Sequence, residues 1–286
     1  MAAGSFYRLS AFTSDPAGGN PAGVWVGDEL PEPAEMQRIA ARVGYSETAF
    51  VAPSQGTRRT VRYYSPEAEV PFCGHATVAA GVQLGRLDGP GDYAFATAAG
   101  EVEVAVRQAD GHSEATLISV EPRHRAAPPE LVAGALAALG WQREELDDAI
   151  PPAVAFAGAW HLVLAAGTAG RLARLDYDFA ALKALMLAAD LTTLQLVWRE
   201  SAGLYHARNP FPVGGVVEDP ATGAAAAALG GYLRDAGLIA APASLLIRQG
   251  EAMGRPSRLT VRIPARGGIA VSGNAVELPR ERGAGG

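Results

Sequence analysis

The segment Phe72 to Gly85, FCGHATVAAGVQLG, places the only cysteine of the chain, Cys73, two residues before His75. A cysteine beside a histidine could be a nucleophile with its base, or two ligands of a metal ion. Side chains two positions apart at a helix start are predicted to point to different faces, which argues against a nucleophile pair. The sequence also predicts no metal site, because the other histidines are scattered without ligand spacing: His112, His124, His161 and His206.

A glycine begins each of two helix-like stretches that are rich in small residues. Gly74 opens the first, and Gly223 opens the second within EDPATGAAAAALGGYL, residues 218–233. Such a start leaves backbone N–H groups free at the positive end of the helix dipole, where anions bind. If the two halves of the chain face each other, we expect these starts to form one cleft for a carboxylate substrate.

The two stretches also match in sequence, since Gly74, Gly81 and Leu84 recur 149 residues later. The matching residues are Gly223, Gly230 and Leu233. An internal duplication explains this, although chance matches among small residues are the alternative.

Polar side chains accompany both helix starts. His75 lies at one and Asp219 near the other, while Glu47 lies in a predicted strand at residues 45–51. Glutamate is uncommon in strands. Glu47 is therefore either an exposed carboxylate at a sheet edge or a functional group.

The elements that position these residues mix strands and helices in both halves. In the first half, alternating apolar residues predict strands at 6–12, 24–26, 45–51, 59–65 and 101–107. A helix is predicted from Pro31 to Gly44, with Gly44 as a left-handed cap. The second half has predicted helices at 131–139, 179–189 and 223–235, and strands at 160–165, 193–199, 245–249, 259–263 and 269–271.

The proline-rich segment EPRHRAAPPE, residues 121–130, is predicted to be a linker between two domains. We predict an N-terminal domain over 1–122 and a C-terminal domain over 128–267, with a last strand at 268–280 that returns to the first domain. The fold class is α+β, an α/β roll in which each half wraps a sheet around a central helix of small residues.

Composition excludes several functional classes. The net charge of −6 over 286 residues argues against a nucleic-acid partner. No apolar run spans a bilayer and the N-terminus lacks a signal-peptide pattern, so we expect no membrane partner and a cytoplasmic location. The single lysine, Lys183, falls in an apolar helical repeat, which disfavours pyridoxal phosphate. Without a dinucleotide fingerprint or a P-loop, no cofactor is expected.

Five segments, in order, give the chain a resemblance to a known family. They are AFTSDPAGGNPAGVW, GYSETAFV, RYYSPEAEVPFCGHAT, VVEDPATGAA and QGEAMGRPSRL. Together they resemble the PhzF family of phenazine-biosynthesis isomerase-like proteins, which shares the diaminopimelate epimerase fold. The resemblance covers nearly the whole chain.

The resemblance implies two pseudo-symmetric halves with the active site between them. It also implies a cofactor-independent isomerase, often a homodimer, that moves a proton within a small carboxylate-bearing substrate. Glu47 matches the acid/base residue of the family, and His75 and Asp219 match residues that line the same pocket. The substrate-binding positions implied are Asn20, Gly74, Gly223 and Ala224.

Two positions depart from what the resemblance leads us to expect. Cys73 falls where the related epimerases keep one of two catalytic thiols, but the chain has no second cysteine, so we expect Cys73 to be a packed hydrophobe. Ala224 stands where the family usually has serine. Two alternatives are therefore kept: an amino-acid or hydroxy-acid epimerase or racemase, and a non-catalytic protein that binds a metabolite or a partner.

Overall fold

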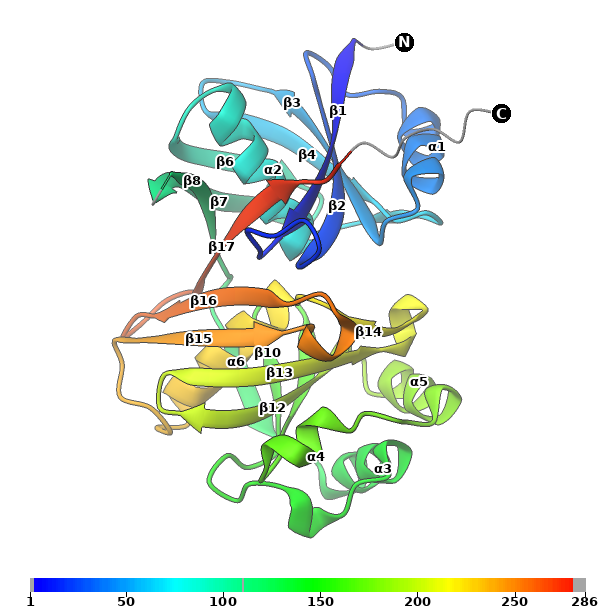
Figure 1. Ribbon diagram of the computed structural model, residues 1–286, viewed down its shortest axis with the longest axis vertical. Coiled ribbons are helices and arrows are strands. Elements are labelled where there is room, and N and C mark those ends of the chain that lie inside the picture. The colour runs from blue at the N-terminus through cyan, green and yellow to red at the C-terminus, as the bar shows by residue number, and fades with distance from the viewer. Residues whose placement is uncertain (1–2, 110, 280–286) are drawn as a thin grey trace. The chain divides into compact units, whose positions relative to one another are not determined.

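The computed structural model describes residues 3–109 and 111–279, which divide into two compact units (Figure 1). The first unit contains the described residues of Met1–Leu117 and Ser272–Gly286, and the second is Ile118–Val271. Both units combine helices with a mixed sheet, as the predicted α+β class requires. No helix among the described residues has both the length and the apolar character needed to cross a membrane.

The first unit has a sheet in which strands distant in sequence are neighbours. Its strands are β1 (Gly4–Ala11), β2 (Asn20–Gly27), β3 (Glu47–Pro53), β4 (Arg58–Tyr64), β5 (Glu69–Val70), β6 (Gly91–Thr97), β7 (Gly100–Ala109), β8 (His112–Ile118) and β17 (Ala270–Glu277). The pairs β2–β3 and β4–β6 are parallel, and the pairs β17–β1, β1–β2, β3–β4, β4–β5, β6–β7 and β7–β8 are antiparallel. Because β17 also pairs with β8, the sheet closes on itself.

Helix α2 (Gly74–Leu87) lies inside this closed sheet, and every residue from His75 to Gly85 is buried. Small residues make this enclosure possible. A Cβ atom added at Gly85 would lie 2.5 Å from a methyl carbon of Val106, so the β7 side chain fits only against a glycine. Helix α1 (Pro33–Val43) packs outside the sheet, where Met36 contacts the cluster of Trp25 and Phe50.

The second unit contains more helices. Its strands are β9 (Arg123–Ala126), β10 (Ala153–Phe156), β11 (Trp160–Ala165), β12 (Thr193–Ser201), β13 (Leu204–Phe211), β14 (Val216–Asp219), β15 (Ala243–Gln249) and β16 (Ser257–Ile263). Its α-helices are α3 (Pro129–Leu139), α4 (Ala169–Ala173), α5 (Phe179–Ala188) and α6 (Gly223–Asp235), and its short 3-10 turns are η1 (Arg143–Glu145), η2 (Pro212–Gly214) and η3 (Glu251–Met253).

The pairing pattern of the first unit recurs in the second. Strands β10 and β11 are antiparallel, β11 and β12 parallel, β12 and β13 antiparallel, β13 and β15 parallel, and β15 and β16 antiparallel. The short strand β14 pairs with β13 as β5 pairs with β4. Helix α6 follows β14 as α2 follows β5, and it is buried over most of its length. The two glycine-opened helices thus occupy equivalent places in their own units.

The predicted linker at 121–130 is wrong, because it contains β9 and the start of α3. Strand β9 pairs antiparallel with β10, with Ala126 opposite Ala153. Its arginines lie over aromatic rings: the guanidinium carbon of Arg123 is 4.5 Å from the ring centre of Phe156, and that of Arg125 is 5.0 Å from the ring centre of Trp160. A strand that packs through arginine shows no apolar alternation in its sequence.

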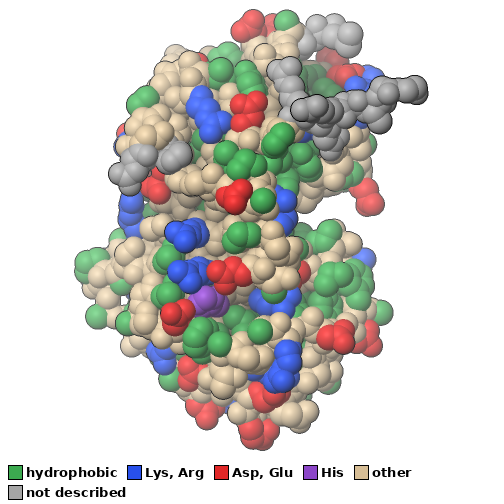
Figure 2. All heavy atoms as spheres, viewed as in Figure 1, with side chains coloured by type: hydrophobic (Ala, Val, Ile, Leu, Met, Phe, Trp, Pro, Cys, Tyr) green, Lys and Arg blue, Asp and Glu red, His purple; other side chains and the backbone are tan. Residues whose placement is uncertain are grey.

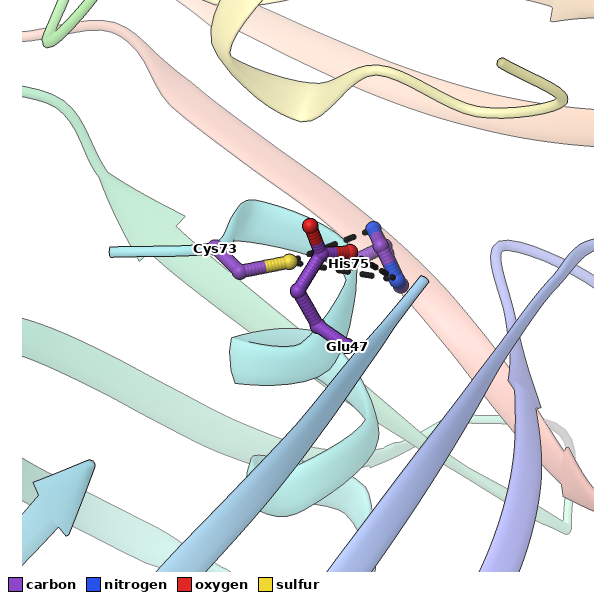
Figure 3. A group of neighbouring side chains, drawn as sticks. All are labelled: Glu47, Cys73 and His75. Carbon is purple, nitrogen blue, oxygen red and sulfur yellow. Dashed lines mark hydrogen bonds and ion pairs between the residues drawn. The ribbon is translucent and has the colours of Figure 1, made fainter. Parts of the chain in front are cut away.

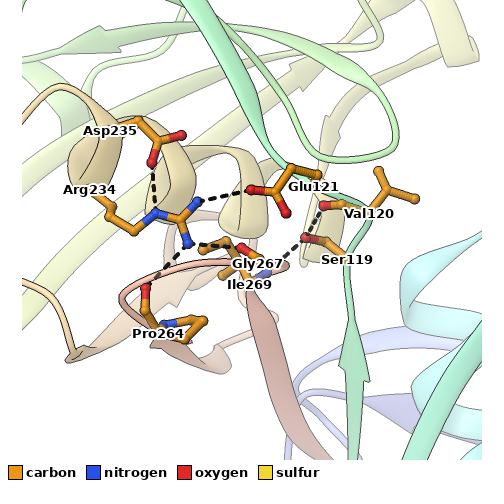
Figure 4. A network of polar contacts seen from close by, with 8 residues as sticks. All are labelled: Ser119, Val120, Glu121, Arg234, Asp235, Pro264, Gly267 and Ile269. Atoms are coloured by element: carbon orange, nitrogen blue, oxygen red, sulfur yellow. Dashed lines mark hydrogen bonds and ion pairs between the residues drawn. The ribbon is translucent and has the colours of Figure 1, made fainter.

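Arg234, at the end of α6, holds the segments that lead out of the second unit (Figure 4). Its guanidinium donates to the carbonyl oxygens of Pro264 and Gly267, at 3.2 and 2.8 Å, and pairs with Glu121 and Asp235. Nearby, the Ser119 hydroxyl accepts from the Ile269 N–H at 2.9 Å. These bonds hold together the segments where the chain enters and leaves the second unit. On the face drawn in Figure 2, acidic and basic side chains are interspersed.

Candidate functional site

Glu47 is the first residue of β3, a strand with a neighbouring strand on each side in the sheet. Gly44 ends α1 in the left-handed conformation (φ 72°), and the chain enters β3 at Glu47, two residues later than predicted. β3 pairs with β2, where Ala22 is opposite Glu47, and with β4 on its other side. The Glu47 side chain is 17% exposed. The alternative of an exposed edge carboxylate is therefore wrong.

Alternation along β3 aims Glu47 at the central helix. Phe50 belongs to the cluster under α1, on the outer face of the sheet. Odd-numbered residues of β3 point to the opposite face, toward α2. Glu47 therefore faces the start of the helix that carries His75.

The start of α2 is held by a buried chain of hydrogen bonds. Cys73 is the N-cap residue, with an extended backbone (φ −146°, ψ 118°), and its carbonyl oxygen accepts from the Thr77 N–H at 3.0 Å and the Thr77 hydroxyl at 2.7 Å. The hydroxyl of Tyr63 lies 2.6 Å from Thr77 Oγ1. Burial raises the pKa of Tyr63, so its phenol stays protonated and donates.

Three chemically different side chains converge here: Glu47, Cys73 and His75 (Figure 3). His75 Nε2 lies 3.4 Å from Glu47 Oε2, and His75 Nδ1 lies 3.3 Å from Cys73 Sγ. The prediction that Cys73 and His75 point to different faces is wrong. Helical spacing does not apply, because Cys73 precedes the helix in extended conformation and its side chain turns back over the first turn.

Hydrogen-bond roles follow from this arrangement. When Nδ1 of His75 accepts from the Cys73 thiol, Nε2 carries the ring hydrogen and faces the Glu47 carboxylate as an ion-pair contact at 3.4 Å. Ser46 Oγ lies 3.3 Å from the same Nε2, and Ser46 is exposed, so the cluster reaches the surface there. The donor atoms of Glu47, Cys73 and His75 all lie within 4.8 Å of one another and could also hold a metal ion. The sequence indicated no ligand near His75 beyond Cys73, and the fold supplies Glu47.

The corresponding place in the second unit is the turn from β14 into α6. Asp219 ends β14, and its Oδ2 accepts from the Thr222 hydroxyl at 2.5 Å. Gln249, at the end of β15, donates to the Asp219 carbonyl oxygen at 2.7 Å and accepts from the Thr222 N–H at 3.3 Å. Gly223 is the first residue of α6 and Ala224 the second. The turn is therefore fixed by side-chain bonds before α6 begins.

Arginine and glycine complete this turn. Arg208 forms a two-pronged ion pair with the buried carboxylate of Glu218, the residue before Asp219, at 3.0 and 2.5 Å. Gly250 has φ 76°, and a Cβ atom there would lie 2.3 Å from the carbonyl oxygen of Arg255. The QGEAMGRPSRL segment thus supports the loop that carries Asp219.

The predicted site residues fall into one group in each unit. In the first unit Glu47, His75 and Gly74 come together, and Asn20 is a buried residue at the start of the neighbouring strand β2. In the second unit the group is Asp219, Gly223 and Ala224. Sequence reasoning missed Cys73 as a neighbour of Glu47, and it missed the supporting residues Ser46, Tyr63, Thr77, Thr222 and Gln249. All five lie in the segments that carry the resemblance, which could have indicated them.

Known proteins resemble this chain in sequence and in fold. The family model described as phenazine biosynthesis-like protein matches residues 9–280. The chain is 30% identical over 281 residues to YfhB of Bacillus subtilis (strain 168), an uncharacterized isomerase, covering 94% of each chain. It is 31% identical over 284 residues to the trans-2,3-dihydro-3-hydroxyanthranilate isomerase of Pseudomonas aeruginosa (strain PAO1), covering 96% of this chain and 97% of that one. The fold matches a crystal structure of a PhzF-family protein from Bacillus anthracis with a TM-score of 0.83 and 24% identity, over 96% of both chains. The chain therefore belongs to the PhzC-PhzF family of phenazine biosynthesis-like proteins.

Proposed function

We propose that this protein is a cofactor-independent isomerase in which Glu47 moves a proton between two positions of one small carboxylate-bearing substrate. The observation that carries the proposal is the placement of the Glu47 carboxylate 3.4 Å from His75 Nε2, at the start of a buried helix. Relatives over nearly the whole chain are named isomerases. A partly enclosed carboxylate beside a histidine is suited to acid/base work.

The proposed reaction has two proton transfers. Glu47 takes a proton from a carbon next to an unsaturated group, and the electron pair moves into that group. The protonated Glu47, whose side chain is 17% exposed and can exchange its proton with solvent, then gives a proton to another carbon, so substrate and product are isomers and nothing else is consumed. His75 helps to hold the Glu47 carboxylate in place through the ion-pair contact of its Nε2 at 3.4 Å.

Negative charge that develops on the substrate during proton removal is stabilised by hydrogen-bond donors. The free backbone N–H groups at the start of α2, beginning with Gly74, supply them together with the positive end of the helix dipole. A substrate carboxylate fits such donors. Asp219 and the N–H groups of Gly223 and Ala224, in the second unit, are proposed to orient the amino or hydroxyl groups of the substrate.

A single base is favoured over two bases. In a two-base epimerase, the acid and base lie on opposite faces of one carbon, each about 3–3.5 Å from it, and so about 6–7 Å apart. The carboxylate of Glu47 and the thiol of Cys73 are within 4.8 Å of each other, which leaves no room for a carbon between them. This spacing disfavours a two-base epimerase that uses Glu47 and Cys73 as its pair.

The proposed substrate class rests on the name of one relative and on the residue at position 224. The relative from Pseudomonas aeruginosa is named for trans-2,3-dihydro-3-hydroxyanthranilate, a small unsaturated amino acid with a hydroxyl group. We propose a substrate of that chemical class. Ala224 cannot donate the side-chain hydrogen bond of the usual serine, a loss of about 1 kcal/mol, so the preferred compound is expected to differ in its polar groups.

The test is a screen of small unsaturated carboxylates for deuterium uptake in D₂O, read by mass spectrometry and NMR. Deuterium uptake reports proton transfer whatever the product is. The parent protein is expected to label at least one compound of this class and Glu47→Gln to label none. Labelling by neither would support the alternative of a non-catalytic binding protein.

A further inference from the structure

We propose that Glu47, Cys73 and His75 form a binding site for one thiophilic divalent cation of the Zn²⁺ class. The site offers a thiol, an imidazole and a carboxylate, the three ligand types that zinc binds in proteins. Among the residues that the structure describes, no other three histidine, cysteine or acidic side chains bring their donor atoms so close together.

The distances suit tetrahedral coordination. Bonds of about 2.0–2.3 Å from zinc separate neighbouring N, O and S ligands by about 3.4–3.6 Å. In the cluster, His75 Nε2 is 3.4 Å from Glu47 Oε2 and 3.8 Å from Cys73 Sγ. An ion bound through Nε2 also requires the imidazole ring or the thiol to turn, because Cys73 Sγ lies closer to Nδ1, at 3.3 Å.

The surroundings suit a charged ion as well. The thiol loses its proton on binding, so the thiolate and the carboxylate together neutralise the two charges of the ion. Cys73 and His75 are buried, which keeps competing water away, while Glu47 and the exposed Ser46 leave an approach from solvent. Three protein ligands leave a fourth position for water or for an anion.

A second histidine cluster provides an internal control. His206 contacts Glu200 through Nε2, at 2.6 Å, and Glu251 through Nδ1, at 3.3 Å. Unlike Glu47, Cys73 and His75, these three side chains are not a group of described residues whose ligand atoms all lie close enough together for one ion. His206→Gln is therefore a matched variant that removes a histidine between acids without touching the proposed site.

Metal binding has a consequence that rests on the proposed function. The ion would occupy the carboxylate of Glu47, the proposed base, and Zn²⁺ would then inhibit proton exchange at one equivalent. Binding itself is measured without substrate, so it stands or falls independently of the isomerase proposal.

The experiment is a calorimetric titration of the chelator-treated protein with Zn²⁺, repeated for Cys73→Ser, Glu47→Gln and His206→Gln. We expect one ion per chain, at least about 100-fold weaker binding for the first two variants, and unchanged binding for His206→Gln. The threshold follows from the 10- to 100-fold losses that even outer-shell changes cause. Co²⁺ added instead should give a thiolate-to-cobalt charge-transfer band in the parent and none in Cys73→Ser.

Several results would overturn the site: no binding by the parent, equal binding by Cys73→Ser, or binding that His206→Gln abolishes. Circular dichroism and melting curves establish that each variant is folded, and Glu47→Gln serves as the second test should Cys73→Ser fail to fold. If Zn²⁺ binds as expected and the metal-free parent exchanges no proton with any substrate, the isomerase proposal fails and the metal site stands.

Discussion

The pair Tyr63 and Thr77, which supports the start of α2, allows a quantitative test of the structure. Tyr63→Phe removes one buried hydrogen bond, that from the phenol to Thr77 Oγ1 at 2.6 Å, and should cost about 0.5–1.5 kcal/mol of unfolding free energy. Thr77→Val should cost more, about 2–3 kcal/mol. It leaves the fully buried phenol without its partner and also removes the bond from Thr77 to the Cys73 carbonyl oxygen at 2.7 Å.

The double variant distinguishes this account from two independent effects. With both hydroxyls gone no phenol is left unpaired, so the double variant should be more stable than the sum of the single losses predicts, by at least about 1 kcal/mol. Urea unfolding of the four proteins, followed by fluorescence and circular dichroism, gives the free energies. Strictly additive losses would contradict the bond between the two hydroxyls.

Three further predictions concern single residues. Burial lowers the pKa of His161 to about 3, whereas an unfolded histidine titrates near about 6.5, so the unfolded state alone takes up this proton as the pH falls from about 6.5 to about 3. The unfolding free energy should therefore drop over that pH window, by up to about 1.4 kcal/mol per pH unit from this group. The drop with falling pH should be shallower in His161→Gln than in His206→Gln. Equal slopes in the two variants would refute the prediction for His161. Cys73→Ala should reduce proton exchange on any substrate found by less than about 100-fold, and a larger loss in the folded, metal-free protein would make the thiol part of the chemistry. Gly250→Ala should lower the unfolding free energy by at least about 1 kcal/mol more than Gly254→Ala in chemical denaturation, because both have positive φ but only Gly250 lacks space for a Cβ atom.

Much of the fold was predictable because the strongest signals are local. The cap at Gly44 ends α1 as expected, and the helices at Gly74 and Gly223 begin as predicted. The misses have physical reasons. β9 packs through arginine rather than apolar residues. β17, at Ala270–Glu277, lies within the predicted last strand at 268–280, although the alternation seen at 269–271 is interrupted further on by Gly273 and Asn274.

The site was predictable only in part, because its geometry depends on contacts between distant segments. The positions of Glu47, His75 and Asp219 beside the helix starts and in a strand drew attention to them, but their roles came from the resemblance. The convergence of Cys73 on His75 depends on the extended backbone at Cys73, which no helical pattern reveals. The support by Tyr63 needs β4 to lie beside α2, a relation set by the closed sheet.

The role of Glu47 is tested most directly by the rate of substrate proton exchange with D₂O in Glu47→Gln. Glutamine keeps the size of the side chain and cannot take up a proton, so exchange should fall by about 10² to 10⁴. Melting temperature should change little, and the exposed carboxylate variant Glu67→Gln should exchange at the parent rate. If Glu47→Gln exchanges substrate protons as fast as the parent protein, Glu47 is not the base and the proposed mechanism is wrong.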